Sequence, residues 1–306
     1  MKTPYTLIAA IDFTPYCRAA LRQAVRLAAQ SGGKVVAIHV MDAHLLGELK
    51  KALATTEVSI RADWESRLRE FIAESEVALP EGSGENAFLE VEVRIGHPAA
   101  ELAEACRVYE ADLLVMGVMG EQSKPHRVGA IAAKCVRMTS TDVLLVSESV
   151  SGAFKCIVAC VDFSPNSAKA VEYALRIAKL DGASLDCLHV YQSALALSLD
   201  YGGLAAPMPV GADSETLQSW NRDLEEFVQP LISAECQSVP VTLKVLERVN
   251  IREAIVDHVI ERQADLVVLG TRGKTGLREL LIGTTAEKVV SNAHCSTLAV
   301  KPDEAG

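Results

Sequence analysis

The chain contains one internal duplication that spans almost its whole length. Residues 6–15 recur as residues 156–165, and the offset of 150 that relates Asp12 to Asp162 holds far along both copies. Residues 111–117 likewise match residues 264–270. A solenoid unit has a period of tens of residues at most, so a repeat of this length indicates a duplicated domain. The residues of the first copy that recur at the constant offset are Ala9, Asp12, Phe13, Pro15, Ala20, Ala24, Arg26, Ala28, Gly32, His39 and Val40.

The length of the chain agrees with two domains. A chain of 306 residues suits two domains of ordinary size better than one. The join falls near residues 149–152, a short polar stretch of the kind that links domains. We therefore expect one domain over residues 1–149 and a second over residues 153–303.

Composition limits the class of protein. Hydrophobic residues make up 49% and charged residues 23%, a balance typical of a globular protein with a sizeable core. The net charge of −10 disfavours a general nucleic-acid binder, which usually needs a basic face. The apolar run near the N-terminus is too short for a secretory signal, and no run reaches the length of a membrane-spanning helix. We expect a cytoplasmic protein that binds neither nucleic acid nor membrane.

The cysteines are expected to be reduced thiols. Eight cysteines are scattered along the chain without a CxxC pair. Cys156 and Cys160 are close in sequence, but on one extended strand they would lie about 13 Å apart, too far for a disulfide. Free thiols are the usual state in the cytoplasm.

Strand and helix patterns alternate in each half. The second half is expected to follow the order of the first, with an added segment, 193–211, rich in Ala, Gly, Pro and Leu. That segment is either an ordinary surface insertion or a mobile lid or dimer contact. In the first half the expected strands are 5–11, 34–40, 88–94, 112–117 and 142–147, and the expected helices are 15–31, 98–109, 129–138 and a helical region 45–79 broken near Thr55 and Thr56.

This alternation predicts an α/β fold with two doubly wound parallel sheets. Apolar strands that alternate with helices form parallel sheets with helices on both faces. Ligands of such sheets bind at the carboxyl ends of the strands, where the winding reverses. Asp162, Val190 and Gly270 each end a predicted strand of the second half, so we expect them to line one pocket.

A glycine-rich loop in the second half predicts a phosphate site. Gly270 ends a buried strand, a polar loop with Arg272 and Lys274 follows, and Gly283 and Thr284 open a helix. Glycine lets backbone N–H groups approach an anion, and a helix N-terminus offers unpaired N–H groups with partial positive charge. A plain surface loop with a helix cap is the alternative, which the strand–loop–helix context disfavours.

At this loop the sequence resembles a known family. Gly270-x-x-Gly273, nine residues and Gly283-Thr284 resemble the nucleotide loop of ATP-binding universal stress proteins, and both halves fit the family's pattern of elements. The resemblance implies that Asp162 reaches the adenosine, that the Val190 backbone meets adenine, and that the loop holds ribose and phosphates. The residues that it assigns to ATP are Cys160, Asp162, Val190, Gly270, Thr271, Arg272, Gly273, Lys274, Gly283, Thr284 and Thr285.

The resemblance also implies an assembly. Family members have Rossmann-like five-stranded sheets of order 3-2-1-4-5 and dimerise through the fifth strand. We therefore expect strands 141–147 and 296–301 to pair antiparallel, which makes the chain an intramolecular pseudo-dimer. A homodimer of tandem chains is left open.

The first half departs from the nucleotide pattern. Eight residues instead of nine precede Gly129, and Ala130 replaces the hydroxyl residue. Met119 stands in place of Arg272, and Glu121 in place of Lys274, where a carboxylate would repel phosphate. We expect a degenerate site in this half, with the shorter loop rotating the helix start away from a phosphate.

Other motifs in the sequence give weaker evidence for a function. His39 and His189 end equivalent strands and fit hydrogen-bonded structural histidines better than ligand contacts. His294 and Cys295 lack partners at metal-ligand spacing, and no GxSxG, HExxH, Walker A or SGGxDS-like sequence is present.

Together these features predict an ATP-binding stress-response protein that acts as a sensor or regulator of an unidentified protein partner. Mg²⁺ is expected to accompany the phosphates of ATP. A slow ATPase, an enzyme that uses ATP on a small molecule, and a nucleotide-independent scaffold remain alternatives, and no residue is placed as a general base.

Overall fold

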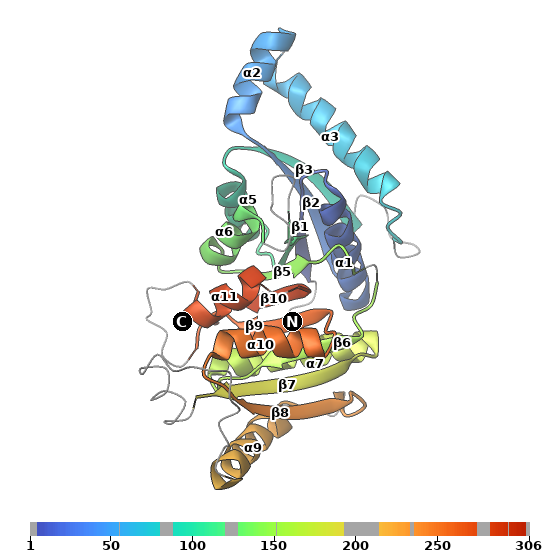
Figure 1. Cartoon of the computed structure of the whole chain (residues 1–306). Helices are drawn as coiled ribbons and strands as arrows, with labels where there is room; N and C mark the ends of the chain where they lie inside the picture. The colour runs from blue at the N-terminus through green and yellow to red at the C-terminus, as the bar shows by residue number, and fades with distance from the viewer. Residues whose placement is uncertain are drawn as a thin grey trace. The chain divides into compact units, whose positions relative to one another are not determined.

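The computed structural model of the chain describes residues 5–54, 56–79, 88–119, 128–150, 152–192, 214–232, 236–273, 282–292 and 294–303. Contacts divide the chain into two compact units, Met1–Gly152 and Ala153–Gly306. Figure 1 shows each unit as a sheet flanked by helices. The antiparallel pairing of the two units stays a prediction.

The first unit is a doubly wound parallel sheet. Its strands lie in the order β3-β2-β1-β4-β5, and all neighbours run parallel. Helices α1 and α3 lie on one side of this sheet and α5 and α6 on the other (Figure 1). The predicted fold and strand order are confirmed. In chain order the elements are β1 (Thr6–Ile11), α1 (Pro15–Ser31), β2 (Lys34–Met41), α2 (Ala43–Leu53), α3 (Glu57–Glu74), β3 (Leu89–Ile95), α5 (Pro98–Val108), β4 (Leu113–Gly117), α6 (Ala130–Met138) and β5 (Asp142–Val146).

The second unit repeats this arrangement. Its parallel strands lie in the order β8-β7-β6-β9-β10, which is the same topology as in the first unit. Helix α7 packs on β6 and β9, and α10 packs against α11. The elements are β6 (Cys156–Cys160), α7 (Pro165–Asp181), β7 (Ser184–Tyr191), α9 (Ser214–Val228), the 3₁₀ helix η1 (Gln229–Leu231), β8 (Val241–Glu247), α10 (Ile251–Glu261), β9 (Leu266–Gly270), α11 (Thr284–Asn292) and β10 (Ser296–Val300).

Local sequence signals set the ends of the first helix in each unit. Proline occupies the first turn of both α1 and α7, where its missing N–H costs nothing. Gly32 and Gly182 end these helices in the left-handed conformation, with φ of 65° and 66°. The caps before the prolines differ, because Ser164 forms a capping box with Ser167 whereas the Thr14 side chain makes no cap bond.

The long helical region of the first unit is two helices, as the predicted break near Thr55 and Thr56 requires. Ala54 ends α2 in the left-handed conformation, and the Thr56 hydroxyl accepts a hydrogen bond from the Ser59 N–H to start α3. Met41, Leu46 and Ile60 form a small buried core there.

Fully buried aliphatic side chains on the central strands form the core of each sheet. Ile8 and Val115 in the first unit, and Ile157 and Val268 in the second, have no exposed surface. Each such side chain contributes about 1.5–3 kcal/mol by leaving water. This rigid sheet fixes the carboxyl ends of its strands, where the candidate site lies.

Candidate functional site

A tight turn after β6 holds the Asp162 carboxylate in place. Asp162 Oδ1 accepts hydrogen bonds from the Ser164 backbone N–H at 3.0 Å and from the Ser164 hydroxyl at 2.5 Å. Phe163 between them has a φ of 60°, an uncommon conformation for a residue other than glycine. Such strain costs on the order of 1 kcal/mol or more and concentrates at functional sites.

The glycine loop after β9 passes directly over this turn. A Cβ on Gly273 would overlap the Asp162 Oδ2 atom, and a Cβ on Gly270 would stand 2.9 Å from Asn166 Nδ2. Asn166 Nδ2 donates to the Arg272 carbonyl oxygen at 3.3 Å, which ties the loop to the start of α7. A side chain at either glycine would therefore displace the Asp162 or Asn166 side chain, and the loop brings its backbone to the carboxylate.

The loop closes on itself at the start of α11. The Gly283 N–H donates to the Thr271 carbonyl oxygen at 2.7 Å, and the Glu287 N–H donates to the Gly283 carbonyl oxygen. Helix α11 begins at Thr284, which is exposed. The first N–H groups of a helix have no intrahelical partner, so this end of the loop presents donors and partial positive charge.

Two buried polar atoms in this region have no hydrogen-bond partner among the described residues. They are Oγ1 of Thr271, whose residue is 0% exposed, and Oδ1 of Asn166, whose residue is 6% exposed. A buried polar group left unpaired costs about 1–3 kcal/mol. The close cradle at Gly273, the fixed carboxylate and these unpaired atoms fit a polar ligand such as a nucleotide.

Arg252 is a basic residue at this site that the sequence analysis did not find. It lies in the first turn of α10, and its Nη2 donates to the Thr284 hydroxyl at 3.4 Å. A comparison of the two copies could have found Arg252. The second copy has Arg252 and Thr284 at the positions where the first copy has Ala99 and Ala130.

Comparison with known proteins agrees with this architecture. The model of the "Universal stress protein family" matches residues 5–147 and again residues 153–301. The chain belongs to the universal stress protein family.

Relatives of this universal stress protein match one half or the whole chain. A universal stress protein of Methanocaldococcus jannaschii is 35% identical over 148 residues, which cover 48% of this chain and 82% of the relative. Universal stress protein A homolog 1 of Coxiella burnetii is 30% identical over 152 residues, covering 48% and 96%. A universal stress protein structure from Archaeoglobus fulgidus aligns with a TM-score of 0.64 at 15% identity over 98% of this chain and 99% of that one, which shows the shared fold.

The other residues that the resemblance assigns to ATP differ in their burial and position. Burial raises the pKa of the Cys160 thiol at the end of β6 to about 12, which disfavours the reactive thiolate form. Val190 is buried near the end of β7, and Thr285 follows Thr284 in the first turn of α11. Lys274 and the segment 193–211 lie outside the described residues. All eight cysteines are described, and all are free thiols, as expected.

Equivalent aromatic clusters flank the turn in each unit. His39 in the first unit stacks on Trp64 at 4.8 Å between ring centroids, and Phe13 lies 4.6 Å from His39. In the second unit His189 lies 4.9 Å from Trp220 and 4.6 Å from Phe163. These clusters contain both tryptophans of the chain.

The two histidines are structural, as expected. Nδ1 of His39 lies 2.8 Å from the Ile11 carbonyl oxygen, and Nδ1 of His189 lies 2.8 Å from the Val161 carbonyl oxygen. Each therefore links the ends of the first two strands of its unit.

The first unit keeps part of the site. Asp12 is held as Asp162 is, with Oδ1 accepting from the Thr14 N–H and hydroxyl. The Gly129 N–H donates to the Val118 carbonyl oxygen at 2.8 Å, which is the same closure that Gly283 makes. The expected rotation of the helix start away from a phosphate stays a prediction. Glu121 lies outside the described residues.

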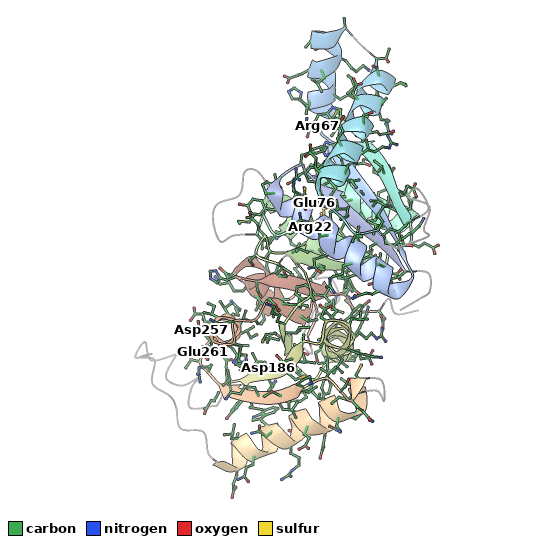
Figure 2. The ribbon with its side chains drawn as sticks, turned by 90° about the vertical axis from the view of Figure 1, so that its right-hand side faces the viewer. Arg22, Arg67, Glu76, Asp186, Asp257 and Glu261 are labelled. Atoms are coloured by element: carbon green, nitrogen blue, oxygen red, sulfur yellow. The ribbon has the colours of Figure 1, made fainter. Side chains whose placement is uncertain are left out.

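Away from the glycine loop, the second unit has an ion pair between the buried Asp186 carboxylate and the exposed Arg262, and the first unit has Val36 at the position of Asp186. Asp186 on β7 is 2% exposed and accepts from Arg262 Nε at 2.6 Å and Nη2 at 3.1 Å. His258 Nε2 lies 3.4 Å from the same carboxylate. Figure 2 shows Asp186 beside α10, which also carries Asp257 and Glu261.

Two kinds of feature are absent from the described parts of the chain. They hold no group of three or more His, Cys, Asp or Glu side chains arranged to bind a metal ion. None of the helices in the described ranges combines the length and apolarity that crossing a membrane requires.

Proposed function

We propose that the second unit binds ATP and that the chain acts as a nucleotide-dependent sensor or regulator in the cytoplasm. The observation that carries this proposal is the contact between two separate elements. The glycine loop lies against the fixed Asp162 carboxylate at Gly273, and the same loop ends at the N-terminus of α11. One ligand that joins a hydroxyl-bearing sugar to phosphates matches both ends.

Each part of the site has a distinct task in this proposal. Asp162 accepts hydrogen bonds from the ribose, and the Val190 backbone faces the adenine. The α11 N–H groups, the Thr284 and Thr285 hydroxyls and Arg272 bind the phosphates. Mg²⁺ would enter with the phosphates and be bound by phosphate oxygens and several waters, so a preformed cluster of three carboxylates is not required.

Binding supplies the regulatory step. ATP that binds the folded second unit stabilises it by RT ln(1 + [ATP]/Kd), about 2.7 kcal/mol at a hundredfold excess over Kd. A surface whose conformation depends on this occupancy can then select a protein partner. We propose that the domains over residues 1–149 and 153–303 differ in this respect, with ATP bound by the second alone.

The proposal is tested by calorimetry and by analysis of the nucleotide released from freshly purified protein. We expect ATP to bind with a stoichiometry near one per chain. Gly273→Ala should abolish binding, because its Cβ would overlap Asp162. A stoichiometry of two with equal affinities would contradict the proposed asymmetry, and the absence of any nucleotide binding would favour a scaffold. Turnover well above about one per minute would instead identify an ATP-using enzyme.

A further inference from the structure

We propose that Arg252 binds the outer phosphates of the nucleotide and makes the second unit prefer ATP to AMP. This inference rests on the proposed function, and it concerns a residue outside the glycine loop. Arg252 reaches the site from α10, so it is separated from Thr284 by 32 positions in the sequence.

The position of Arg252 places it at the phosphate end of the site. The loop meets Asp162 at Gly273 and meets Arg252 at Thr284, the first residue of α11. A nucleotide with its ribose on Asp162 would extend its phosphates toward the α11 N-terminus. The guanidinium, which donates to Thr284, therefore lies beside the α11 N-terminus, where the phosphates are expected.

The local structure leaves the guanidinium available. The Asn250 side chain accepts hydrogen bonds from the Arg252 N–H at 3.1 Å and the Glu253 N–H at 3.3 Å, which fixes the backbone at the base of the arginine. The Arg252 side chain is exposed, and its long bond to Thr284 uses one of five N–H donors. Within the described ranges no carboxylate lies at ion-pair distance from it.

The chemistry of arginine matches a phosphate at this position. A guanidinium presents a planar fork that binds two phosphate oxygens at once, and it stays charged at all physiological pH values. The hydroxyl of Thr284 beside it adds a further donor. The first unit has Ala99 and Ala130 at these two positions. The half with the degenerate loop therefore has neither the arginine nor the hydroxyl.

The test compares ATP, ADP and AMP binding to the full chain by calorimetry. Arg252→Ala should weaken ATP binding about ten- to hundredfold, as expected for loss of charge-assisted hydrogen bonds. AMP binding should change less than about threefold. Arg252→Lys should restore part of the ATP affinity, because it keeps the charge but loses the fork. The control is Arg248→Ala, which removes an exposed arginine from the connection that precedes α10, where Nη1 donates to the Glu247 carbonyl oxygen.

Each outcome of these titrations either supports or overturns the role of Arg252. A lower ATP-to-AMP affinity ratio in Arg252→Ala, with Arg248→Ala unchanged, supports the inference. Equal weakening of ATP and AMP, or no weakening, overturns the role of Arg252 while the proposed ATP site stands. Failure of the wild-type chain to bind any of the three nucleotides overturns the proposed function and this inference with it. Unchanged thermal unfolding of the variants without nucleotide separates a binding defect from a folding defect.

Discussion

The Asp162 carboxylate occupies the space beside Gly273 that a β-carbon would fill. The two residues are 111 positions apart (273 − 162), and they meet because β6 and β9 are neighbours in the parallel sheet. Gly273 is not in the left-handed backbone region, so its need for glycine arises from this contact alone. The contact defines the ribose end of the proposed site.

Replacing Gly273 by alanine is expected to abolish ATP binding and to destabilise the second unit by about 1–3 kcal/mol, the usual cost of overpacking. Adding Asp162→Ala should remove the steric overlap and restore stability, while ATP binding stays lost because the carboxylate is absent. Gly47→Ala is the matched control, since a Cβ there would meet nothing within 4 Å. Thermal unfolding with and without ATP measures both effects. Full ATP stabilisation of Gly273→Ala would contradict the assignment.

The fluorescence emission of Trp220 is expected to change when ATP binds, and that of Trp64 is not. The Trp220 ring lies 5.8 Å from Phe163 and 4.9 Å from His189, and these residues directly neighbour Asp162 and Val190 in sequence. Its emission should therefore change when ATP binds beside this turn. The measurement is a titration of Trp64→Phe, which retains Trp220 alone, against Trp220→Phe. A response confined to Trp64 would place the ligand in the first unit.

The ion pair between the buried Asp186 carboxylate and the exposed Arg262 is expected to show coupling in stability. Arg262→Ala should lower the free energy of unfolding of the second unit by about 2 kcal/mol, because it leaves a buried carboxylate without its main partner. The double change Asp186→Val with Arg262→Ala should recover most of that loss. The first unit carries Val36 at the position of Asp186, which shows that the fold accepts an apolar side chain there.

Denaturant unfolding followed by Trp220 emission in the Trp64→Phe background measures this coupling. Additive effects of the two substitutions would contradict it.

Acid is expected to destabilise the first unit through His39. Burial lowers the pKa of His39 from its ordinary value of 6.5, and the nearby Arg67 lowers it further, against opposing effects of the Ile11 carbonyl and Asp12. Arg67 lies on α3 (Figure 2), with its guanidinium 4.7 Å from the Phe13 ring centroid.

The sign follows from proton linkage. Between the lowered folded pKa of His39 and 6.5, the unfolded chain binds more protons than the folded one, so stability falls as the pH drops below about 6.5. Unfolding followed by Trp64 emission in Trp220→Phe should show this loss between pH 7 and pH 5. His39→Gln should flatten the pH dependence, whereas His44→Gln, at an exposed histidine on α2, should not. An unchanged slope in His39→Gln would exclude His39 as the cause.

The sequence by itself determined the duplication, the order of strands and helices, and the glycine loop. These features depend on local signals: apolar strands of five to eight residues, proline at the first helical turn, and glycine where the backbone turns left-handed, as at Gly32 and Gly182. The same signals occur in both copies, so each of these elements is predicted twice. A parallel doubly wound sheet then follows, because alternating strands and helices have few other ways to bury their apolar faces.

Only the tertiary structure decided which side chains meet at the site. Asn166 ties to the Arg272 carbonyl, Asp162 lies against Gly273, and Arg252 reaches Thr284 across separate elements. Contacts of this kind depend on strand register, sheet twist and helix packing, which the residues set collectively and no local pattern encodes. The sequence therefore located the loop. The packing of β6, α7 and α10 around it decided which side chains contact the loop.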